Sequence, residues 1–151
     1  MINFLKKSIA KIWAKNHVAK TEDFKNNAEV LQEKLLLDLV KKSEKTLFGL
    51  QHNFSEIKSV EDFQKNVKIS DYEDLKPFVE KVKQNKKNIL WPEKPEYFAK
   101  TSGTTSGAKY IPLTKESMPF HIQAARNAIL SYIHETGKAE FVKGKMIFLQ
   151  G

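Results

Sequence analysis

Tyr97-Phe98-Ala99-Lys100 and Lys109-Tyr110-Ile111-Pro112-Leu113 read as two short strands, and Thr101-Ser102-Gly103-Thr104-Thr105-Ser106-Gly107-Ala108-Lys109 joins them. Seven of these nine joining residues are Gly, Ser or Thr. Because few side chains shield its backbone, such a loop can direct N–H groups and hydroxyls at one anion, as a polyphosphate requires. The glycines permit positive φ and a close approach to a ligand, and the lysine adds a cation. The stretch therefore predicts a phosphate-binding hairpin.

This loop differs from the two best-known phosphate-binding motifs. A P-loop has four residues between its glycines, followed by Lys and a Ser or Thr, whereas three residues separate Gly103 from Gly107 and Tyr110 follows Lys109. No Gly-x-Gly-x-x-Gly opens a helix after a strand, as dinucleotide-binding folds require. Phosphate affinity would come from the loop's own donors and Lys109. Judged on composition, a flexible hairpin connection is the alternative.

Composition bounds the class of protein. The chain has 151 residues, of which 40% are hydrophobic and 29% charged, as in a soluble globular domain. No apolar run approaches the roughly 20 residues of a membrane span, and the start lacks the features of a secretory signal. We therefore expect a cytoplasmic protein without stable membrane insertion. The absence of cysteine excludes disulfides and thiolate metal sites.

The formal net charge of +8 comes almost entirely from lysine, because Arg126 is the only arginine. Reading of guanine edges is chiefly the work of arginine. The lysines are also interleaved with acidic residues, as in 29–45 and 71–87. We therefore expect no nucleic-acid partner and interpret the lysines as a solvated surface, with binding to an anionic ligand or acidic partner as the alternative.

Helical patterns fill the chain before the hairpin. Residues 2–15 place Ile2, Leu5, Ile9 and Ile12 at helical spacing with lysines beside them, which predicts a basic amphipathic helix. Such a helix can lie on a membrane, but we expect it to dock on the protein's own body. A second amphipathic pattern covers 27–47.

Local signals predict where these helices begin and end. Gly49 is expected at the C-terminus of the second helix. Ser59 and Ser70, each followed three residues later by an acid, match the capping box and predict two short helices. Pro77 is expected to interrupt the latter and to open a fresh helix.

After the hairpin, Thr114 or Ser117 can cap a helix with Pro119 in its first turn, and Gly137 would end it. Met146-Ile147-Phe148-Leu149 reads as a strand buried on both faces. The expected strands are fewer than the roughly five or six of a usual sheet. We therefore predict an α/β fold that is helix-rich here, with an incomplete sheet, as the N-terminal part of a larger adenylating domain. We expect three segments in it: an amphipathic helix over 1–20, a helical segment over 21–96, and the phosphate-loop hairpin, a helix and a buried strand over 97–151.

The hairpin motif resembles a known family. Thr-Ser-Gly-Thr-Thr-Ser-Gly at 101–107, followed by Lys109 and Pro112, is similar to the nucleotide-phosphate signature of acyl-adenylating enzymes. Its particular form resembles the Gretchen-Hagen, or auxin-responsive promoter, family of acyl-acid amido synthetases. Further family motifs occur in the expected order: Lys45-Thr46-Leu47-Phe48-Gly49, Phe63-x-x-x-Val67, Ile69 to Phe78, and Ile89-Leu90-Trp91-Pro92.

The resemblance implies an activity. The family activates a carboxylic acid with ATP and Mg²⁺ as an acyl-adenylate, and an amine such as an amino acid then attacks to form an amide. It also implies site roles, with Ser102, Thr104, Thr105 and Ser106 as hydroxyl donors and Gly103 and Gly107 wrapping the phosphates. Lys109 would pair with the phosphates, and Thr101 would orient the turn. The family's later motifs are absent, so this chain is expected to need the remainder of its own chain and to be inactive alone.

No other constellation of residues predicts chemistry. The four histidines, His17, His52, His121 and His134, have no metal-ligand spacing and are interpreted as surface or packing residues. No protein metal site and no catalytic acid or base is assigned. The competing function is non-enzymatic, a lysine-rich helical module that binds an acidic partner.

Overall fold

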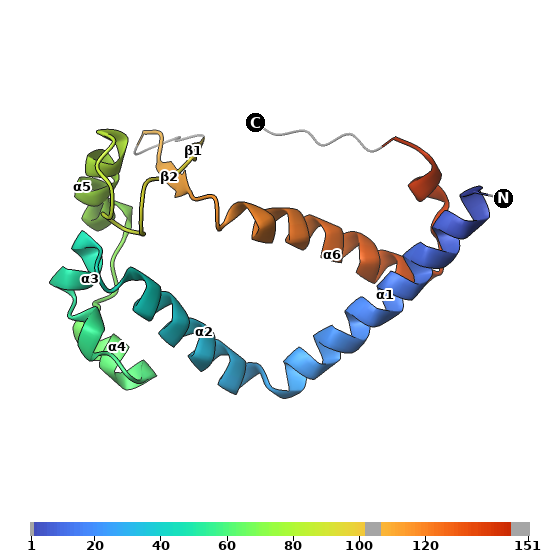
Figure 1. Cartoon of the computed structure of the whole chain (residues 1–151), viewed down its shortest axis with the longest axis horizontal. Helices are drawn as coiled ribbons and strands as arrows, with labels where there is room; N and C mark the ends of the chain where they lie inside the picture. The colour runs from blue at the N-terminus through green and yellow to red at the C-terminus, as the bar shows by residue number, and fades with distance from the viewer. Residues whose placement is uncertain (1, 102–106, 146–151) are drawn as a thin grey trace. The chain divides into compact units, whose positions relative to one another are not determined.

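The computed structural model describes residues 2–101 and 107–145. Figure 1 shows a helix-rich chain with one antiparallel hairpin, which confirms the predicted fold class. The elements in chain order are α1 (Ile2–Asn26), α2 (Ala28–Ser43), α3 (Leu47–Gln51), the 3-10 helix η1 (Phe54–Glu56), α4 (Val60–Asn66), α5 (Tyr72–Lys83), β1 (Tyr97–Lys100), β2 (Tyr110–Leu113), α6 (Met118–Thr136) and the 3-10 helix η2 (Glu140–Lys143).

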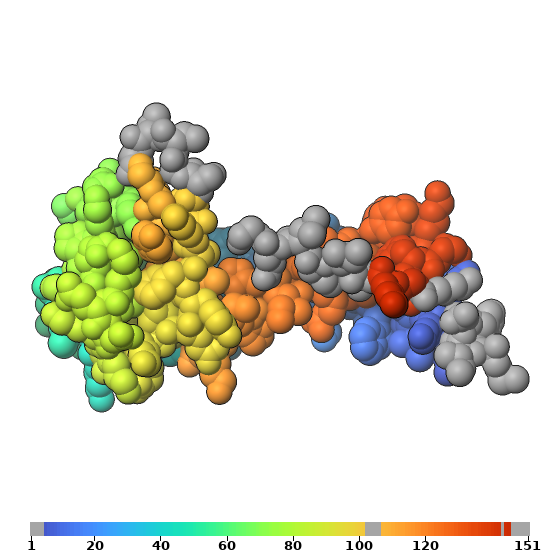
Figure 2. All heavy atoms as spheres, turned by 90° about the horizontal axis from the view of Figure 1, so that it is seen from above, coloured from blue at the N-terminus to red at the C-terminus, as the bar shows by residue number. Residues whose placement is uncertain are grey.

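The chain forms two compact units. One comprises residues 1–28 with 119–151, and the other comprises residues 29–118. The first has a small core of Ala14, Leu130, Ile133 and Ala139, which joins α1, α6 and the start of η2. Figure 2 shows η2 in red against the blue N-terminal part of α1.

The α1 helix docks through a different face from the one expected. It buries its alanine side, with Ala14 only 1% exposed, because small side chains let the helices approach closely. Leu5, Ile9 and Ile12 lie on another side and are exposed in the described part of the chain. The expectation that this apolar stripe docks on the protein's own body is therefore wrong. The helix also continues beyond the predicted pattern, to Asn26.

The predicted helix over 27–47 divides into α2 and α3. Thr46 breaks the run because its side chain caps α3, accepting a hydrogen bond from the Gly49 N–H at 3.0 Å and donating to the Ser43 carbonyl at 2.7 Å. Gly49 therefore lies inside α3, not at the end of α2. It is buried, and a Cβ there would lie 2.1 Å from the Ser43 carbonyl oxygen.

The caps of α4 and α5 were predicted to within one residue. Ser59 caps α4 as expected, accepting from the Asp62 N–H. The capping box of α5 uses Asp71 and Asp74 instead of Ser70. The predicted break at Pro77 is also wrong, because α5 runs through it. Pro77 is exposed, so water can reach the carbonyl that loses its partner.

The second unit has its own core, formed by residues of α2, η1 and the segment after η1, with partly buried side chains of α3 and α4 packed against it. Val40, Phe54 and Ile57 are buried together, and the Phe48 ring meets Phe54 and Phe78 edge-on at 5.8 and 5.3 Å between ring centroids. The first two N–H groups of α3 donate hydrogen bonds to the segment that follows α5. The Leu47 N–H donates to the Asn88 carbonyl, and the Phe48 N–H donates to the Ile89 carbonyl. This core therefore fixes the segment that leads into the hairpin.

The α6 helix follows the predicted signals. Thr114 and Ser117 exchange side-chain and backbone hydrogen bonds just before it. Gly137 ends it with a φ of +67°, which confirms the glycine signal at its C-terminus. The predicted strand over 146–149 lies outside the described residues.

Candidate functional site

The candidate site is the stem of the β1–β2 hairpin. The strands are antiparallel, with Tyr97 opposite Leu113 and Lys100 opposite Tyr110. One further pair closes the stem: the Thr101 N–H donates to the Lys109 carbonyl at 3.0 Å, and the Lys109 N–H donates to the Thr101 hydroxyl at 3.3 Å. The two ends of the predicted phosphate loop are thus held together.

The outer edge of β2 faces α5. Because Thr101 and Lys109 form a hydrogen-bonded pair, the next pair, Lys100 and Tyr110, has its N–H groups directed away from the ladder. The Tyr110 N–H donates to the Tyr72 hydroxyl of α5 at 2.9 Å. The other outward position in β2 is Pro112, which has no N–H to satisfy. Tyr72 therefore attaches the hairpin to the helix at the point where the loop begins.

Two lysines at the loop's base stand over tyrosine rings. The Lys109 ammonium lies 5.4 Å from the centroid of the Tyr72 ring, and the Lys83 ammonium lies 4.4 Å from that of Tyr110. Both distances suit cation–π attraction. A hydrogen bond to Glu80 raises the pKa of Lys83 above its ordinary value, which further favours the charged form. The stem thus places two lysine ammonium groups near the hydrogen-bonded backbone of Thr101 and Lys109.

Lys109 and Lys83 differ in their ionic partners. Lys83 is paired with Glu80 at 2.8 Å. Within residues 5–101 and 107–142, no carboxylate forms an ion pair with Lys109, which is half-buried against Tyr72. An ammonium that contacts only a neutral ring keeps its full positive charge, so it can attract an incoming anion more strongly than one already paired with a carboxylate.

Gly107 begins the return to the stem. Its φ of +81° is a conformation that favours glycine, and a Cβ there would meet no atom within 4 Å. The constraint at this position is therefore conformational, not steric. Of the other predicted site residues, Thr101 and Lys109 are brought together, whereas Ser102, Gly103, Thr104, Thr105 and Ser106 lie outside the described residues.

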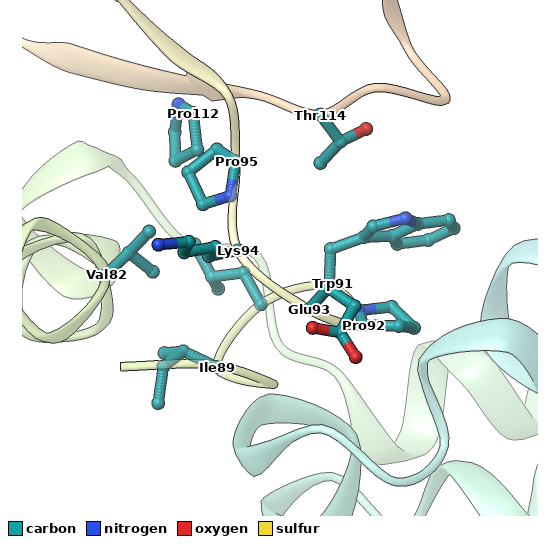
Figure 3. Close-up of a pocket in the computed structure, with 10 residues that line it drawn as sticks. Val82, Ile89, Trp91, Pro92, Glu93, Lys94, Pro95, Pro112 and Thr114 are labelled. Atoms are coloured by element: carbon teal, nitrogen blue, oxygen red, sulfur yellow. The ribbon is translucent and has the colours of Figure 1, made fainter. Parts of the chain in front are cut away.

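A seam below the hairpin is packing rather than a ligand site. Figure 3 shows Val82, Ile89, Trp91, Pro95 and Pro112 lining a small cavity between α5, the 89–95 connection and β2. The cavity they enclose is about 20 Å³. That volume holds a single water at most, whereas ligand pockets are usually hundreds of cubic ångströms. The seam therefore supports the hairpin from below.

Sequence reasoning missed Tyr72, Tyr110 and Lys83 as parts of this site. Tyr72 belongs to a predicted helix start and to the motif from Ile69 to Phe78, but nothing in its spacing indicates that its hydroxyl meets a strand 38 positions later. The histidines fit the packing interpretation where they are placed, since His52 stacks on Phe48 and bonds its carbonyl. His17 contacts the Ser131 hydroxyl. The described residues contain no cluster of three or more His, Cys, Asp or Glu side chains that could hold a metal ion.

The fold and the site together define a class of helix-rich α/β proteins with a Gly-, Ser- and Thr-rich hairpin loop, beside which Lys109 has no carboxylate partner among the described residues. Comparison with known proteins narrows the class. The model of the GH3 family N-terminal domain matches residues 17–150. The chain therefore belongs to the GH3 family, as its motifs predict.

One curated relative is much longer than this chain. The indole-3-acetic acid-amido synthetase GH3.15 of Arabidopsis thaliana is 28% identical over 122 residues, which cover 79% of this chain and 20% of the relative. The chain thus spans about a fifth of the length of that enzyme.

Proposed function

We propose that this chain provides the ATP-phosphate-binding hairpin of an acyl-acid amido synthetase. The observation that carries the proposal is the closure of the stem by Thr101 and Lys109, which brings together both ends of the hydroxyl-rich loop. Membership of the GH3 family and a relative named as an amido synthetase support it.

The proposed reaction has two steps. A carboxylate oxygen of a small organic acid attacks the α-phosphorus of ATP, and the bond to pyrophosphate breaks. The amine of an acceptor such as an amino acid then attacks the acyl carbon, the amide bond forms, AMP leaves and the amine loses a proton. ATP supplies the leaving group, so the protein must chiefly position reactants and stabilise charge.

The loop residues have distinct proposed roles. The hydroxyls of Ser102, Thr104, Thr105 and Ser106 and the amides around Gly103 and Gly107 would donate to phosphate oxygens, a donor set that suits a polyphosphate. Lys109 would stabilise the charge that builds on pyrophosphate. Mg²⁺ would be bound with ATP. No general acid or base is assigned.

The remaining proposals concern the whole protein. We propose a cytoplasmic enzyme in which the remainder of its own chain supplies the other substrate contacts, with this portion inactive alone. The alternative, a lysine-rich module for an acidic partner, has weaker support because several lysines are already paired with carboxylates. These pairs include Lys41–Glu44, Lys42–Glu116 and Lys87–Glu93.

Calorimetric titration with ATP and with adenosine tests the proposal. The chain is expected to bind ATP weakly, in the millimolar range, and adenosine more weakly still, because the contacts are to phosphates. Lys109→Gln should weaken ATP binding about tenfold, the factor that ~1.4 kcal/mol represents. Lys100→Gln is the matched control. Lys100 is an exposed lysine at the end of β1, and its replacement should change ATP binding little. Equal effects of the two substitutions, or equal affinity for ATP and adenosine, would contradict the proposal.

The hydroxyls can be tested in a polypeptide that contains the complete adenylating domain. Thr104→Ala or Thr105→Ala is expected to lower acid-dependent ATP–pyrophosphate exchange, by about tenfold or more for each lost donor to the developing charge. Thr136→Ala, at an exposed position at the end of α6, serves as the control. Exchange rates equal to those of the unsubstituted protein would show that these hydroxyls do not hold the phosphates.

A further inference from the structure

The α1 helix presents an apolar face to solvent. Leu5, Ile9, Ile12 and Trp13 are 60, 42, 59 and 59% exposed, and together they form what we call the α1 stripe. Large apolar side chains scattered singly are common on surfaces, but a contiguous set marks an interaction site. At 100° per residue, these four side chains fall within an arc of about 100° on the helix. The stripe is therefore one surface.

Among the described residues, the core that holds α1 to its own unit does not include the stripe. Ala10 and Ala14 provide the packing contacts with Leu130 and Ile133, and a bond from Lys7 to Glu140 at 2.6 Å adds a polar tie to η2. These side chains lie on a different side of the helix from the stripe. The helix can thus keep its internal contacts while the stripe binds something else.

The surroundings of the stripe are strongly basic. The first 21 residues contain five lysines and no aspartate or glutamate. By the same helical geometry, Lys6 and Lys15 fall on either side of the stripe, and Lys20 continues it by two turns. Beside Trp13, a hollow of about 320 Å³ is lined by Lys20 and Arg126. The partner of this surface must therefore be anionic as well as apolar.

The family comparison bears on what covers the stripe. The matched family domain begins at residue 17, so all four stripe residues precede it. The stripe therefore lies outside the part of the chain that matches the family model. A second copy of α1 is disfavoured as the partner, because self-pairing would bring two lysine-bordered faces together.

We propose that the α1 stripe docks reversibly on an anionic lipid bilayer surface. Apolar side chains would enter the boundary between headgroups and acyl chains, Trp13 would lie at that boundary, and the lysines would meet lipid phosphates. Within the described residues no helix is long and apolar enough to cross a membrane. The helix would thus lie along the surface, and docking would bring the proposed enzyme close to amphipathic acids dissolved in the bilayer.

Vesicle flotation tests this proposal on the chain as it stands. The chain should float with vesicles of equal parts phosphatidylcholine and phosphatidylglycerol, and should not float with phosphatidylcholine alone. Replacing Leu5, Ile9 and Ile12 together by Gln should reduce binding at least tenfold, since burial of each apolar side chain is lost. Ile69→Gln, at a fully exposed isoleucine outside α1, is the control and should bind like the original chain.

Charge and fluorescence provide further readouts. Replacing Lys6, Lys15 and Lys20 by Gln should weaken binding by roughly fivefold per lysine, and added salt should act in the same direction. In a Trp91→Phe variant, Trp13 is the one remaining tryptophan, and its emission should shift to shorter wavelength on anionic vesicles. Flotation of the original chain decides the question if that variant fails to fold.

Three results would overturn the proposal. They are absence of binding to anionic vesicles, equal binding to neutral vesicles, and binding that the stripe substitutions leave unchanged. Sedimentation equilibrium tests the alternative partner, a second copy of the chain. If the chain does not bind vesicles but forms a dimer that the stripe substitutions abolish, the partner is a second copy. These outcomes do not depend on ATP, so they are distinct from a failure of the proposed function.

Discussion

Tyr72 is the residue that connects the helical part of its unit to the candidate site. Its hydroxyl accepts from the Tyr110 N–H at 2.9 Å, and its ring lies under the Lys109 ammonium. One side chain therefore satisfies the outer edge of β2 and positions the lysine at the loop's exit. A tyrosine is suited to both tasks because it has a polar tip and a negatively polarised face.

Tyr72→Phe separates these two contributions. The ring and its contact with Lys109 remain, but the Tyr110 N–H loses its partner. We expect a loss of about 1 kcal/mol in the free energy of unfolding, as for one unpaired amide. Hydrogen exchange at the Tyr110 amide should become faster. Urea denaturation and NMR-detected exchange measure the two effects.

The control for this substitution is Tyr97→Phe, in β1, where the side chain is 60% exposed. It should leave both quantities nearly unchanged. A Tyr72→Phe variant with unaltered Tyr110 exchange would show that the hydroxyl does not hold the hairpin edge.

At the scale of elements, the junction of α2 and α3 governs how the hairpin is supported. The α3 helix has only five residues and could not persist on its own. It is held by the Thr46 cap and by two amides that bond the 88–89 segment. That segment continues through Trp91 to β1, so distortion of α3 is expected to reach the hairpin.

Gly49→Ala tests this junction. A Cβ at this position would overlap the Ser43 carbonyl oxygen, which belongs to backbone and cannot rotate away. We expect the free energy of unfolding to fall by about 3 kcal/mol, the upper part of the range for overpacking. Thermal or urea denaturation followed by circular dichroism measures the change.

The matched comparison is Leu50→Ala, on the next residue of α3, which is 67% exposed. Its effect should be small, since no buried contact is lost. If the two substitutions destabilise the chain equally, close packing of Gly49 against the α2 terminus is not what fixes the junction.

At the scale of the whole molecule, the sequence predicted the parts that depend on local signals. The hairpin, the Ser59 cap and the glycine end of α6 are each determined by residues close in sequence, and each was placed correctly. The family followed from motifs quoted in order along the chain.

The errors arose where long-range contacts override local preference. Gly49 resembles a helix end, but backbone from a preceding turn occupies the space beside it. Pro77 is a helix breaker by propensity, yet a capping box and the burial of Val79 and Val82 stabilise α5 around it. The role of Tyr72 depends on a contact between α5 and β2, which no spacing along the chain reveals.

The central claim is that the loop of residues 101–109 binds the triphosphate of ATP. Titration of the isotopically labelled chain with ATP, followed through its backbone amides by NMR, tests it most directly. The account predicts saturable shifts at Thr101, Gly107 and Lys109 that adenosine does not reproduce. Unmoved loop amides, with only diffuse and salt-sensitive shifts over the surface lysines, would contradict it.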